Sequence, residues 1–299
     1  MRIFISLTTV PKRLADVPSV IENITSLLNQ KTDKEYKVIF NIPYVYVPDN
    51  SPYIIPAELQ KLADENPKLI LNRINTDRGP IEKVVGGFNI INDPEDIIIA
   101  LDDDHAYEDS MIEYILKKLP KYPNYAVGFR GDNPLEKRTF IDDNGNKKFI
   151  LISSHGVYFP VKHDTYATIP GHWHSVTYRR KFIQDDFFTD EFLGVAKSDD
   201  LTISYYLRAK KIHFIMLAYD DETNFIPVNS LVKHNGKDIG TPSSHYPIKR
   251  QLSMPSHTGF AVYRNACKEN PTHGVVRKDF DTNYINCGFD KVYDEDVIQ

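Results

Sequence analysis

Three adjacent carboxylates stand in the middle of the sequence, directly after a short apolar run. The run is Ile97 to Leu101, and Asp102, Asp103, Asp104 and His105 follow it. A few β-branched and apolar residues in succession are typical of a strand that is buried on both faces of a parallel sheet. The carboxyl ends of such strands are where open α/β sheets place their ligands.

The three acids predict a site for a metal ion and a phosphate group. Adjacent carboxylates repel one another unless a cation or solvent compensates their charge. Mg²⁺, Mn²⁺ and Ca²⁺ prefer hard oxygen ligands, and Mg²⁺ is commonly held by one or two carboxylates together with substrate phosphates. The alternative is a solvated acidic turn that follows a core strand.

A second group of acids opens a later helix. Ser198 or Asp199 is suited to cap a helix that runs to Lys210, and Asp200 lies in its first turn. A carboxylate near the positive end of a helix is stabilised as the anion, which suits a group that must accept a proton. Asp200 is therefore a candidate general base, and helix capping is the structural alternative.

The elements before these acids alternate between strand and helix. Apolar positions at Val17, Val20, Ile21 and Ile24 recur on one face, as expected for a helix. The alternation predicts an α/β fold with a doubly wound parallel sheet. The predicted strands are Ile3–Leu7, Tyr36–Ile42, Leu69–Ile74 and Ile97–Leu101, and the helices are Val17–Asn29, Ala57–Glu65, Ile81–Ile91 and Asp109–Leu119.

The pattern changes after Leu119. The prolines and tyrosines of Pro43–Pro56 predict a loop in the first half, whereas the second half contains a hairpin signal at Asp142–Gly145. Further strands are predicted at Tyr125–Phe129 and Ile212–Ala218. From Asp220 to Gln299 little periodicity is visible, so we expect loops and short elements laid over the active face.

Composition excludes several classes of protein. The chain has 299 residues, a net charge of −5 and no basic run interleaved with aromatics, so we expect no nucleic-acid partner. The N-terminus lacks a long apolar h-region, and no stretch approaches the roughly 18 apolar residues of a membrane span. The two cysteines fit neither a disulfide framework nor a zinc site. We expect a cytoplasmic protein without a transmembrane segment.

Four stretches together resemble the GT-A fold glycosyltransferases of the family-2 type, over about residues 2 to 218. Asp102-x-Asp104 resembles their DxD motif, and the Asp pair that opens the later helix resembles their E-D or D-D motif. The other two stretches are Ile5–Arg13, which is similar to their first strand and turn, and Asp77-Arg78-Gly79-Pro80-x-x-Lys83, which is similar to a D-x-G-P-x-x-K segment.

The resemblance implies a GT-A-like, doubly wound, mostly parallel central sheet. A Rossmann-like nucleotide-binding half would occupy residues 1–119 and an acceptor half residues 120–219, with a loop-rich extension over 220–299. It also implies a metal-dependent, inverting glycosyltransferase that transfers a sugar from a nucleotide-sugar donor. We expect this donor to be a UDP sugar. The acceptor would be a hydroxyl group of a glycan, a glycoprotein or another molecule.

The resemblance assigns roles to individual residues. Asp200 would be the general base and Asp199 its neighbour in the catalytic pair. Mn²⁺ or Mg²⁺ would be held by Asp104 and Asp102, with His234 or His245 from the C-terminal region as a further ligand. The expected donor-binding residues are Thr8, Pro11, Arg13, Asp77, Lys83, Asp102 and Asp103.

Several of these roles have structural alternatives. Asp77 would accept a hydrogen bond from the uracil N3–H or simply form a turn beside Gly79. Lys83 would reach phosphate or be an ordinary exposed helical lysine. By the period of two, Asp103 should point away from Asp102 and Asp104. Acceptor contacts are expected from the loop residues His172, Trp173 and His174, where sugar stacking and docking onto the core are both open.

Three other functions compete with glycosyl transfer. A phosphohydrolase with an aspartyl nucleophile carries its D-x-D motif after the first strand, whereas this triplet follows the fourth. A sugar nucleotidyltransferase needs a Gly-rich basic loop after strand one, where this chain has Thr8-Thr9-Val10-Pro11. A silent carbohydrate-binding module would have no use for both sets of acids.

Overall fold

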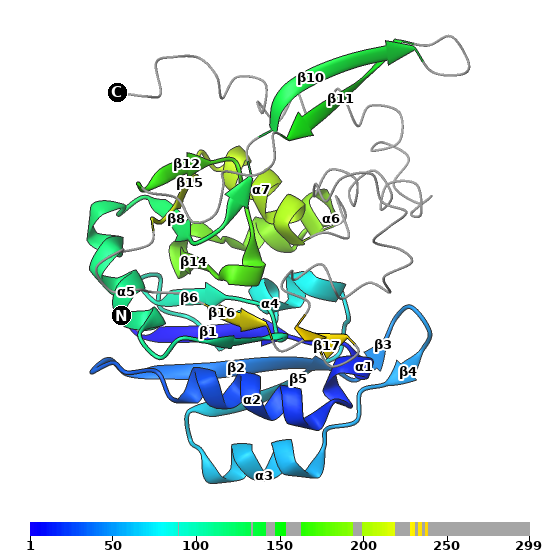
Figure 1. The fold of residues 1–299 in the computed structure, drawn as a ribbon, viewed down its shortest axis with the longest axis vertical. Coiled ribbons are helices and arrows are strands. Elements are labelled where there is room, and N and C mark those ends of the chain that lie inside the picture. The colour runs from blue at the N-terminus through cyan, green and yellow to red at the C-terminus, as the bar shows by residue number, and fades with distance from the viewer. Residues whose placement is uncertain are drawn as a thin grey trace.

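The computed structural model describes residues 1–88, 90–132, 134–141, 147–153, 163–193, 199–218, 228–230, 233–234 and 237–238. In this part of the chain, an eight-stranded sheet forms the centre of the fold, with the order β12-β15-β8-β14-β6-β1-β2-β5 (Figure 1). Its strands are β1 (Ile3–Thr8), β2 (Tyr36–Pro43), β5 (Leu69–Ile74), β6 (Ile97–Ala100), β8 (Tyr125–Gly128), β12 (Thr165–Ala167), β14 (Val176–Arg179) and β15 (His213–Met216).

The sheet is mostly parallel. Strands β5, β2, β1 and β6 are parallel neighbours, and so are β8 and β15. The antiparallel members are β14, which lies between β6 and β8, and β12 at one edge. The predicted α/β class with a mostly parallel central sheet is therefore confirmed.

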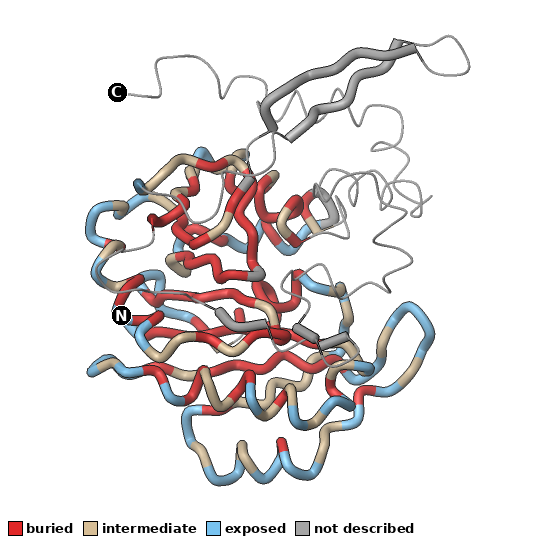
Figure 2. The backbone as a smooth tube through the Cα atoms, in the orientation of Figure 1, coloured by how far each residue is buried: buried red, intermediate tan, exposed pale blue. Residues whose placement is uncertain are grey.

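Apolar side chains cover both faces of the sheet. On β1, Ile3, Ile5 and Leu7 belong to one buried cluster with the helices α2 (Val17–Leu28), α3 (Ala57–Glu65) and α5 (Met111–Lys118). Phe4 belongs to a second cluster with α4 (Glu82–Val85), α6 (Asp190–Leu193) and α7 (Asp199–Ala209). Buried residues accordingly follow one another along the central strands (Figure 2). Such continuous burial is what a doubly wound sheet requires. The short helix α1 (Pro11–Leu14) precedes α2.

One predicted helix is much shorter than expected. The sequence predicts Ile81–Ile91, but the structure has a 3₁₀ turn over Gly79–Ile81 and only one turn of α-helix in α4. Gly86 and Gly87 follow α4 directly, and glycine is about 1 kcal/mol less favourable than alanine inside a helix. The chain instead continues through separate turns, so α4 ends at Val85, two residues after Lys83.

A buried amide network fixes the end of α4 against the sheet. Asn41 on β2 donates to the Ser6 hydroxyl on β1 at 3.0 Å. Asn72 on β5 donates to the side-chain oxygen of Asn41 at 2.8 Å and to the carbonyl of Gly86 at 2.7 Å. Three strands and α4 are thereby held in register, and buried polar groups of this kind specify one arrangement when they are satisfied.

The sequence does not predict strand β14, which completes the sheet between β6 and β8. It has four residues and lies between short 3₁₀ turns, so it carries no clear alternation or turn signal. The loop predicted over Pro43–Pro56 contains a two-residue hairpin, β3 (Val45–Tyr46) with β4 (Ser51–Pro52). The remaining short elements are 3₁₀ turns η2 (Leu119–Lys121), η3 (His172–His174), η4 (Arg180–Phe182) and η5 (Asp185–Phe188), and strands β7 (His105–Tyr107), β9 (Gly131–Asp132) and β13 (Ile169–Pro170).

The two strands predicted to flank Asp142–Gly145 are confirmed, because β10 (Pro134–Ile141) pairs antiparallel with β11 (Lys147–Ser153). The turn residues 142–145 lie outside the described residues. From the C-terminal region the structure describes β16 (Val228–Ser230), β17 (Lys233–His234) and β18 (Lys237–Asp238). Strand β16 pairs antiparallel with β7, which places Ser230 opposite His105. No helix in the described part of the chain has the length and apolar character needed to cross a membrane.

The contact of Gly86 with Asn41 predicts a strong difference between two adjacent glycines. A Cβ atom at Gly86 would lie 2.6 Å from the Asn41 side chain, whereas at Gly87 the nearest atoms would lie at 3.4 Å. We expect Gly86→Ala to lower the free energy of unfolding by about 1–3 kcal/mol, as overpacking typically does. Gly87→Ala should cost much less, because alanine also reduces the entropy of the unfolded chain. Urea denaturation of both variants measures this, and equal losses would contradict the role given to Gly86.

Candidate active site

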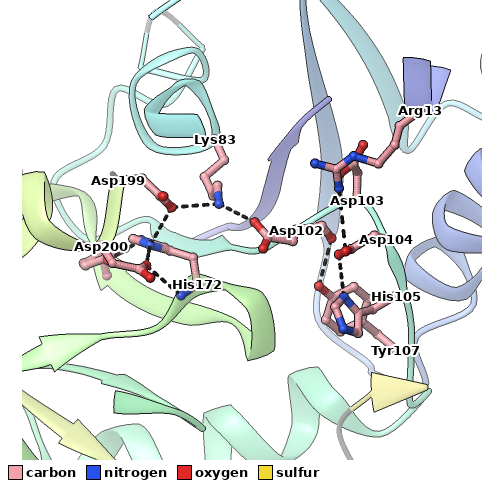
Figure 3. A network of polar contacts seen from close by, with 11 residues as sticks. Arg13, Lys83, Asp102, Asp103, Asp104, His105, Tyr107, His172, Asp199 and Asp200 are labelled. Carbon is pink, nitrogen blue, oxygen red and sulfur yellow. Dashed lines mark hydrogen bonds and ion pairs between the residues drawn. The ribbon is translucent and has the colours of Figure 1, made fainter. Parts of the chain in front are cut away.

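The acidic triplet lies just beyond the end of β6 and its side chains point to two sides (Figure 3). Asp103 forms an ion pair with Nη1 of Arg13, and the same atom lies 3.8 Å from Oδ2 of Asp104. Asp102 instead pairs with Lys83. The expectation that Asp103 points away from both neighbours is therefore wrong. Because β6 ends at Ala100, the period of two no longer applies to the three acids.

Asp104 is the most enclosed of the three acids. Its side chain has no exposed area, and its Oδ1 lies 2.6 Å from Nδ1 of His105. The backbone of His105 is held in turn, because Asn23 on α2 donates to its carbonyl at 2.7 Å. The hydroxyl of Tyr107 donates to the carbonyl of Asp102 at 2.8 Å. The turn that carries the triplet is thus fixed to both α2 and β7.

Lys83 connects the triplet to the second group of acids. Its ammonium pairs with Oδ1 of Asp102 on one side and lies 2.8 Å from Oδ2 of Asp199 on the other. The residue is buried, with 2% of its surface exposed. Burial opposes the charged form, yet the two carboxylates raise the pKa of Lys83 above its usual value. An exposed helical lysine is thus excluded.

His172 on η3 meets both acids of the pair that opens α7. Its Nδ1 lies 2.7 Å from Oδ1 of Asp200 and 3.0 Å from Oδ2 of Asp199. Its backbone N–H also donates to Oδ1 of Asp200 at 3.0 Å. Burial of the ring opposes protonation, but the two carboxylates raise the pKa of His172 to about 9. At neutral pH the ring is therefore an imidazolium ion.

The two acids of this pair differ in their electrostatic surroundings. For Asp199, the nearby Lys83 and His172 outweigh burial and lower the pKa of its carboxyl group. For Asp200, burial and then the charge of Asp199 raise the pKa of its carboxyl group. The side chain of Asp200 is also the more accessible, with 31% exposed against 12% for Asp199.

The donor atoms of His172, Asp199 and Asp200 lie within 4.8 Å of one another, a spacing at which they could hold a metal ion. Two positive charges already face the two carboxylates, however, because Lys83 lies 2.8 Å from Asp199 and the imidazolium of His172 contacts both. Buried charges are stable when they are paired in this way. We assign the cluster to charge pairing within the protein.

Three expected donor-binding residues occupy structural positions near the same edge of the sheet. The hydroxyl of Thr8 donates to the carbonyl of Asn41 at 2.9 Å, and Pro11 is the first residue of α1. Asp77 accepts hydrogen bonds from the backbone N–H of Gly79 at 2.8 Å and from the hydroxyl of Tyr53 at 3.3 Å. Asp77 therefore forms a turn beside Gly79, as its structural alternative predicted. Its contact with the uracil base stays a prediction.

The expected acceptor residues are not arranged as an open aromatic surface. His172 and His174 are buried, with 1% and 3% exposed, so the predicted contact of these rings with an acceptor is opposed by their burial. Burial, followed by the charge of His105, lowers the pKa of His174. Trp173 belongs to η3, but its side chain, like that of His234 on β17, is outside the described part of the structure, and so is all of His245.

The site therefore joins two sets of acids through cations. Sequence reasoning found the triplet and the Asp pair, but it missed the ion pairs that Lys83 and His172 make with them. The only signal for His172 was its place in the Pro-Gly loop, where it was interpreted as an acceptor contact. The arrangement offers carboxylates at the end of β6 and one half-exposed carboxylate, Asp200, on the far side of Lys83.

Solved structures with a similar course of the chain include three of S. aureus TarS. TarS 1-349 in complex with UDP matches with a TM-score of 0.46 and 11% identity, covering 72% of this chain and 57% of that one. TarS 1-349 matches with a TM-score of 0.42 and 13% identity, covering 72% of this chain and 58% of that one. A structure described as TarS matches with a TM-score of 0.45 and 14% identity, covering 74% of this chain and 36% of that one. The match thus spans little more than half of even the shorter TarS chains.

Sequence comparison identifies the family. Among curated proteins, none matches this chain. The model of the family described as "Glycosyl transferase family 2" matches residues 16–190, which is more than half of the chain. The matched range includes Lys83, the acidic triplet and His172, and its end precedes Asp199 and Asp200. The fold expected from the GT-A resemblance is thereby confirmed, and the chain belongs to glycosyl transferase family 2.

Proposed function

We propose that this chain is a glycosyltransferase that uses a metal ion and a UDP sugar, and that it inverts the anomeric configuration with Asp200 as general base. One observation carries the proposal: the ammonium of Lys83 lies between Asp102 of the triplet and Asp199 of the later pair. Acids suited to a donor diphosphate and acids suited to an acceptor hydroxyl are therefore neighbours in a single site.

The donor side of the proposal rests on the triplet. Its carboxylate oxygens are the hard ligands that Mn²⁺ and Mg²⁺ prefer, so the residues fit such an ion. Asp102, with 19% of its side chain exposed, is the accessible ligand, and Asp104 would join it only when its pairing with His105 and Arg13 opens. His234 or His245 remains the proposed further ligand from the C-terminal region.

A bound metal ion would neutralise the charge that develops on the diphosphate leaving group. Arg13 and Lys83 form ion pairs with the triplet, and we propose that they also attract the diphosphate. Because Lys83 is buried and already paired, its contribution would be to hold Asp102 in place and to add positive charge beneath the donor.

The acceptor side of the proposal rests on Asp200. Oδ1 of this residue accepts from the ring and the backbone of His172, whereas Oδ2 accepts from no residue that the structure describes. We propose that Oδ2 takes the proton of the acceptor hydroxyl. The acceptor oxygen then bonds to the anomeric carbon, and the bond from that carbon to the diphosphate oxygen breaks with its electron pair leaving on the nucleoside diphosphate.

The role of Asp200 predicts a selective loss of transfer. Asp200→Asn keeps the shape of the side chain but removes its basicity, so the rate of sugar transfer should fall by about 10²-fold or more. The affinity for UDP should change little, because the base makes little contact with the donor before reaction. Asp185→Asn is a matched control, because Asp185 is an exposed acid of η5. Normal transfer by Asp200→Asn, measured with UDP-glucose and UDP-N-acetylglucosamine, would remove the proposed base.

The two-sided triplet predicts different roles for two adjacent acids. In calorimetry with UDP, Asp102→Asn should weaken binding in the presence of Mn²⁺ by about 10- to 100-fold, the size of effect typical of groups around a metal. Asp103→Asn should retain the response to Mn²⁺ and lose thermal stability instead, because it breaks the buried pair with Arg13. If Asp102→Asn and Asp104→Asn both respond to Mn²⁺ as the unmodified protein does, the metal does not bind at the triplet.

Asp77 predicts the choice of nucleotide. A carboxylate that accepts from uracil N3–H distinguishes UDP from CDP, because cytosine N3 carries no proton. The loss of one hydrogen bond to a charged group is worth about 1.5–3 kcal/mol, which corresponds to a preference of about 10- to 100-fold for UDP. Competition calorimetry with the two nucleotides measures the preference. Equal affinities would leave Asp77 with a structural role, in its contacts with Val47, Tyr53 and Gly79.

A further inference from the structure

One nitrogen of His172 serves two carboxylates at once. Its Nδ1 lies between Oδ1 of Asp200 and Oδ2 of Asp199, at 2.7 Å and 3.0 Å. The backbone N–H of the same residue donates to Oδ1 of Asp200 at 3.0 Å. Two donors from one residue therefore converge on a single oxygen of Asp200, which fixes the plane of that carboxylate.

This arrangement divides the two oxygens of Asp200 between different tasks. Oδ1 is held by His172, whereas Oδ2 has no hydrogen-bond partner among the described residues, and the side chain is 31% exposed. A carboxylate that is fixed through one oxygen presents the other in a constant direction. Fixed geometry of this kind is what proton acceptance in a transition state needs.

The far side of the His172 ring is also fixed. Its Nε2 lies 2.7 Å from the hydroxyl of Tyr178, and both residues are buried, with 1% of each exposed. Tyr178 is on β14, where it is registered with Ile98 on β6. The orientation of the ring therefore depends on the central sheet, at the strand whose end carries the acidic triplet.

The backbone that follows His172 is strained. Ser175, the residue after η3, has a φ of 83°, in the region that favours glycine. Its carbonyl packs so closely on β8 that a Cβ atom at Gly128 would lie 2.6 Å from it. A strained residue costs about 1–3 kcal/mol and persists when its surroundings determine it, typically at functional sites. Here the turn brings the ring of His172 into contact with Asp199 and Asp200 at the start of α7.

We propose that His172 is a positioning residue for the general base: it holds Asp200 through Oδ1, with its ring fixed by Tyr178, so that Oδ2 faces the acceptor hydroxyl. This inference rests on the proposed function of Asp200, and it adds a residue that makes no contact with the substrate itself.

The charges around the ring give the role a measurable consequence. The titratable groups that face His172 are Asp199 and Asp200 from α7 and Tyr178 from β14, with Lys83 from α4 beyond Asp199. The positive ring lowers the pKa of Asp200 against the effects of burial and of Asp199. Without that charge the pKa of Asp200 rises, so the base becomes protonated at a higher pH.

His172→Asn tests the inference, because the amide of asparagine can place an N–H near the position of Nδ1 without the charge. We expect kcat to fall about tenfold at neutral pH, a part of what the base itself contributes. We also expect the acid limb of the rate profile to move upward by about one pH unit, the usual effect of losing an adjacent opposite charge. KM for UDP-glucose or UDP-N-acetylglucosamine should stay the same. An unmoved acid limb would overturn the inference.

Two further variants separate positioning from packing. His174→Asn empties a buried site on the same 3₁₀ turn, so it reports any general damage to η3, and it should leave the acid limb where it is. Tyr178→Phe removes the partner of Nε2 and keeps the charge of the ring, so it should lower kcat without moving the acid limb. If His174→Asn shifts the limb as far as His172→Asn does, the effect is one of packing.

A titration by NMR tests the same contact without any donor. With ¹⁵N-labelled histidine, the ring of His172, assigned from its loss in His172→Asn, should titrate with a pKa of about 9. Asp200→Asn should lower that pKa, because it removes a negative charge from Nδ1. A value near 6.5 in the unmodified protein would show that the pair is absent and would overturn the inference. Failure of the proposed function looks different, because Asp200→Asn would then transfer sugar normally while the pairing of His172 persists.

Discussion

The buried ammonium of Lys83 is the interaction on which the rest of the site depends. It has two carboxylate partners, Asp102 at the end of β6 and Asp199 at the start of α7. An ammonium without a partner in such a position would be costly to bury, and either acid alone would leave part of that cost uncompensated. The end of β6 and the start of α7 are therefore coupled through one charge, and the distance between triplet and pair is set by the reach of a single lysine side chain.

The sheet explains why this coupling is possible. Parallel strands β1, β2, β5 and β6 place α4 over one face, and the Asn41 network holds the end of that helix against three strands. On the other side of β6, the antiparallel strand β14 brings η3 and His172 to the same edge. Cations from two different elements thus meet the acids of α7, and His172 reaches them because β6 has β14 as its neighbour.

Local sequence patterns predicted the elements better than their contacts. The apolar run at Ile97 gave β6 to within one residue, and the apolar face from Val17 gave α2 to the same accuracy. These predictions succeeded because burial on a regular element repeats along the chain. The hydrophobic pattern could not show that Gly86 packs on Asn41, so α4 was predicted too long.

The contacts of the site required tertiary structure. The alternation expected for the three acids failed because it applies only inside a strand, and β6 ends before them. Lys83 was interpreted as a phosphate contact or an exposed lysine, and His172 as an acceptor contact, since the acids that pair with them lie far away in the sequence. Their partners come from other elements, and a charged residue gives no sequence signal of whether it is paired in the core.

The pair Asp199 and Asp200 shows how two identical side chains acquire different tasks from their surroundings. Asp199 lies against Lys83 and His172, and these cations lower the pKa of its carboxyl group, so it stays ionised and serves as their counter-charge. Of these two cations, His172 is the one that Asp200 contacts. Burial, followed by the charge of Asp199, raises the pKa of the Asp200 carboxyl group toward the range in which a base works well. Two adjacent acids whose environments separate their pKa values in opposite directions are the usual means by which one site contains both a fixed anion and a proton acceptor. The more exposed and more basic of the two is Asp200, and the charge of Asp199 adds to the effect of burial on its pKa. The lysine that ties the site together therefore also acts on the proposed chemistry, by keeping Asp199 ionised.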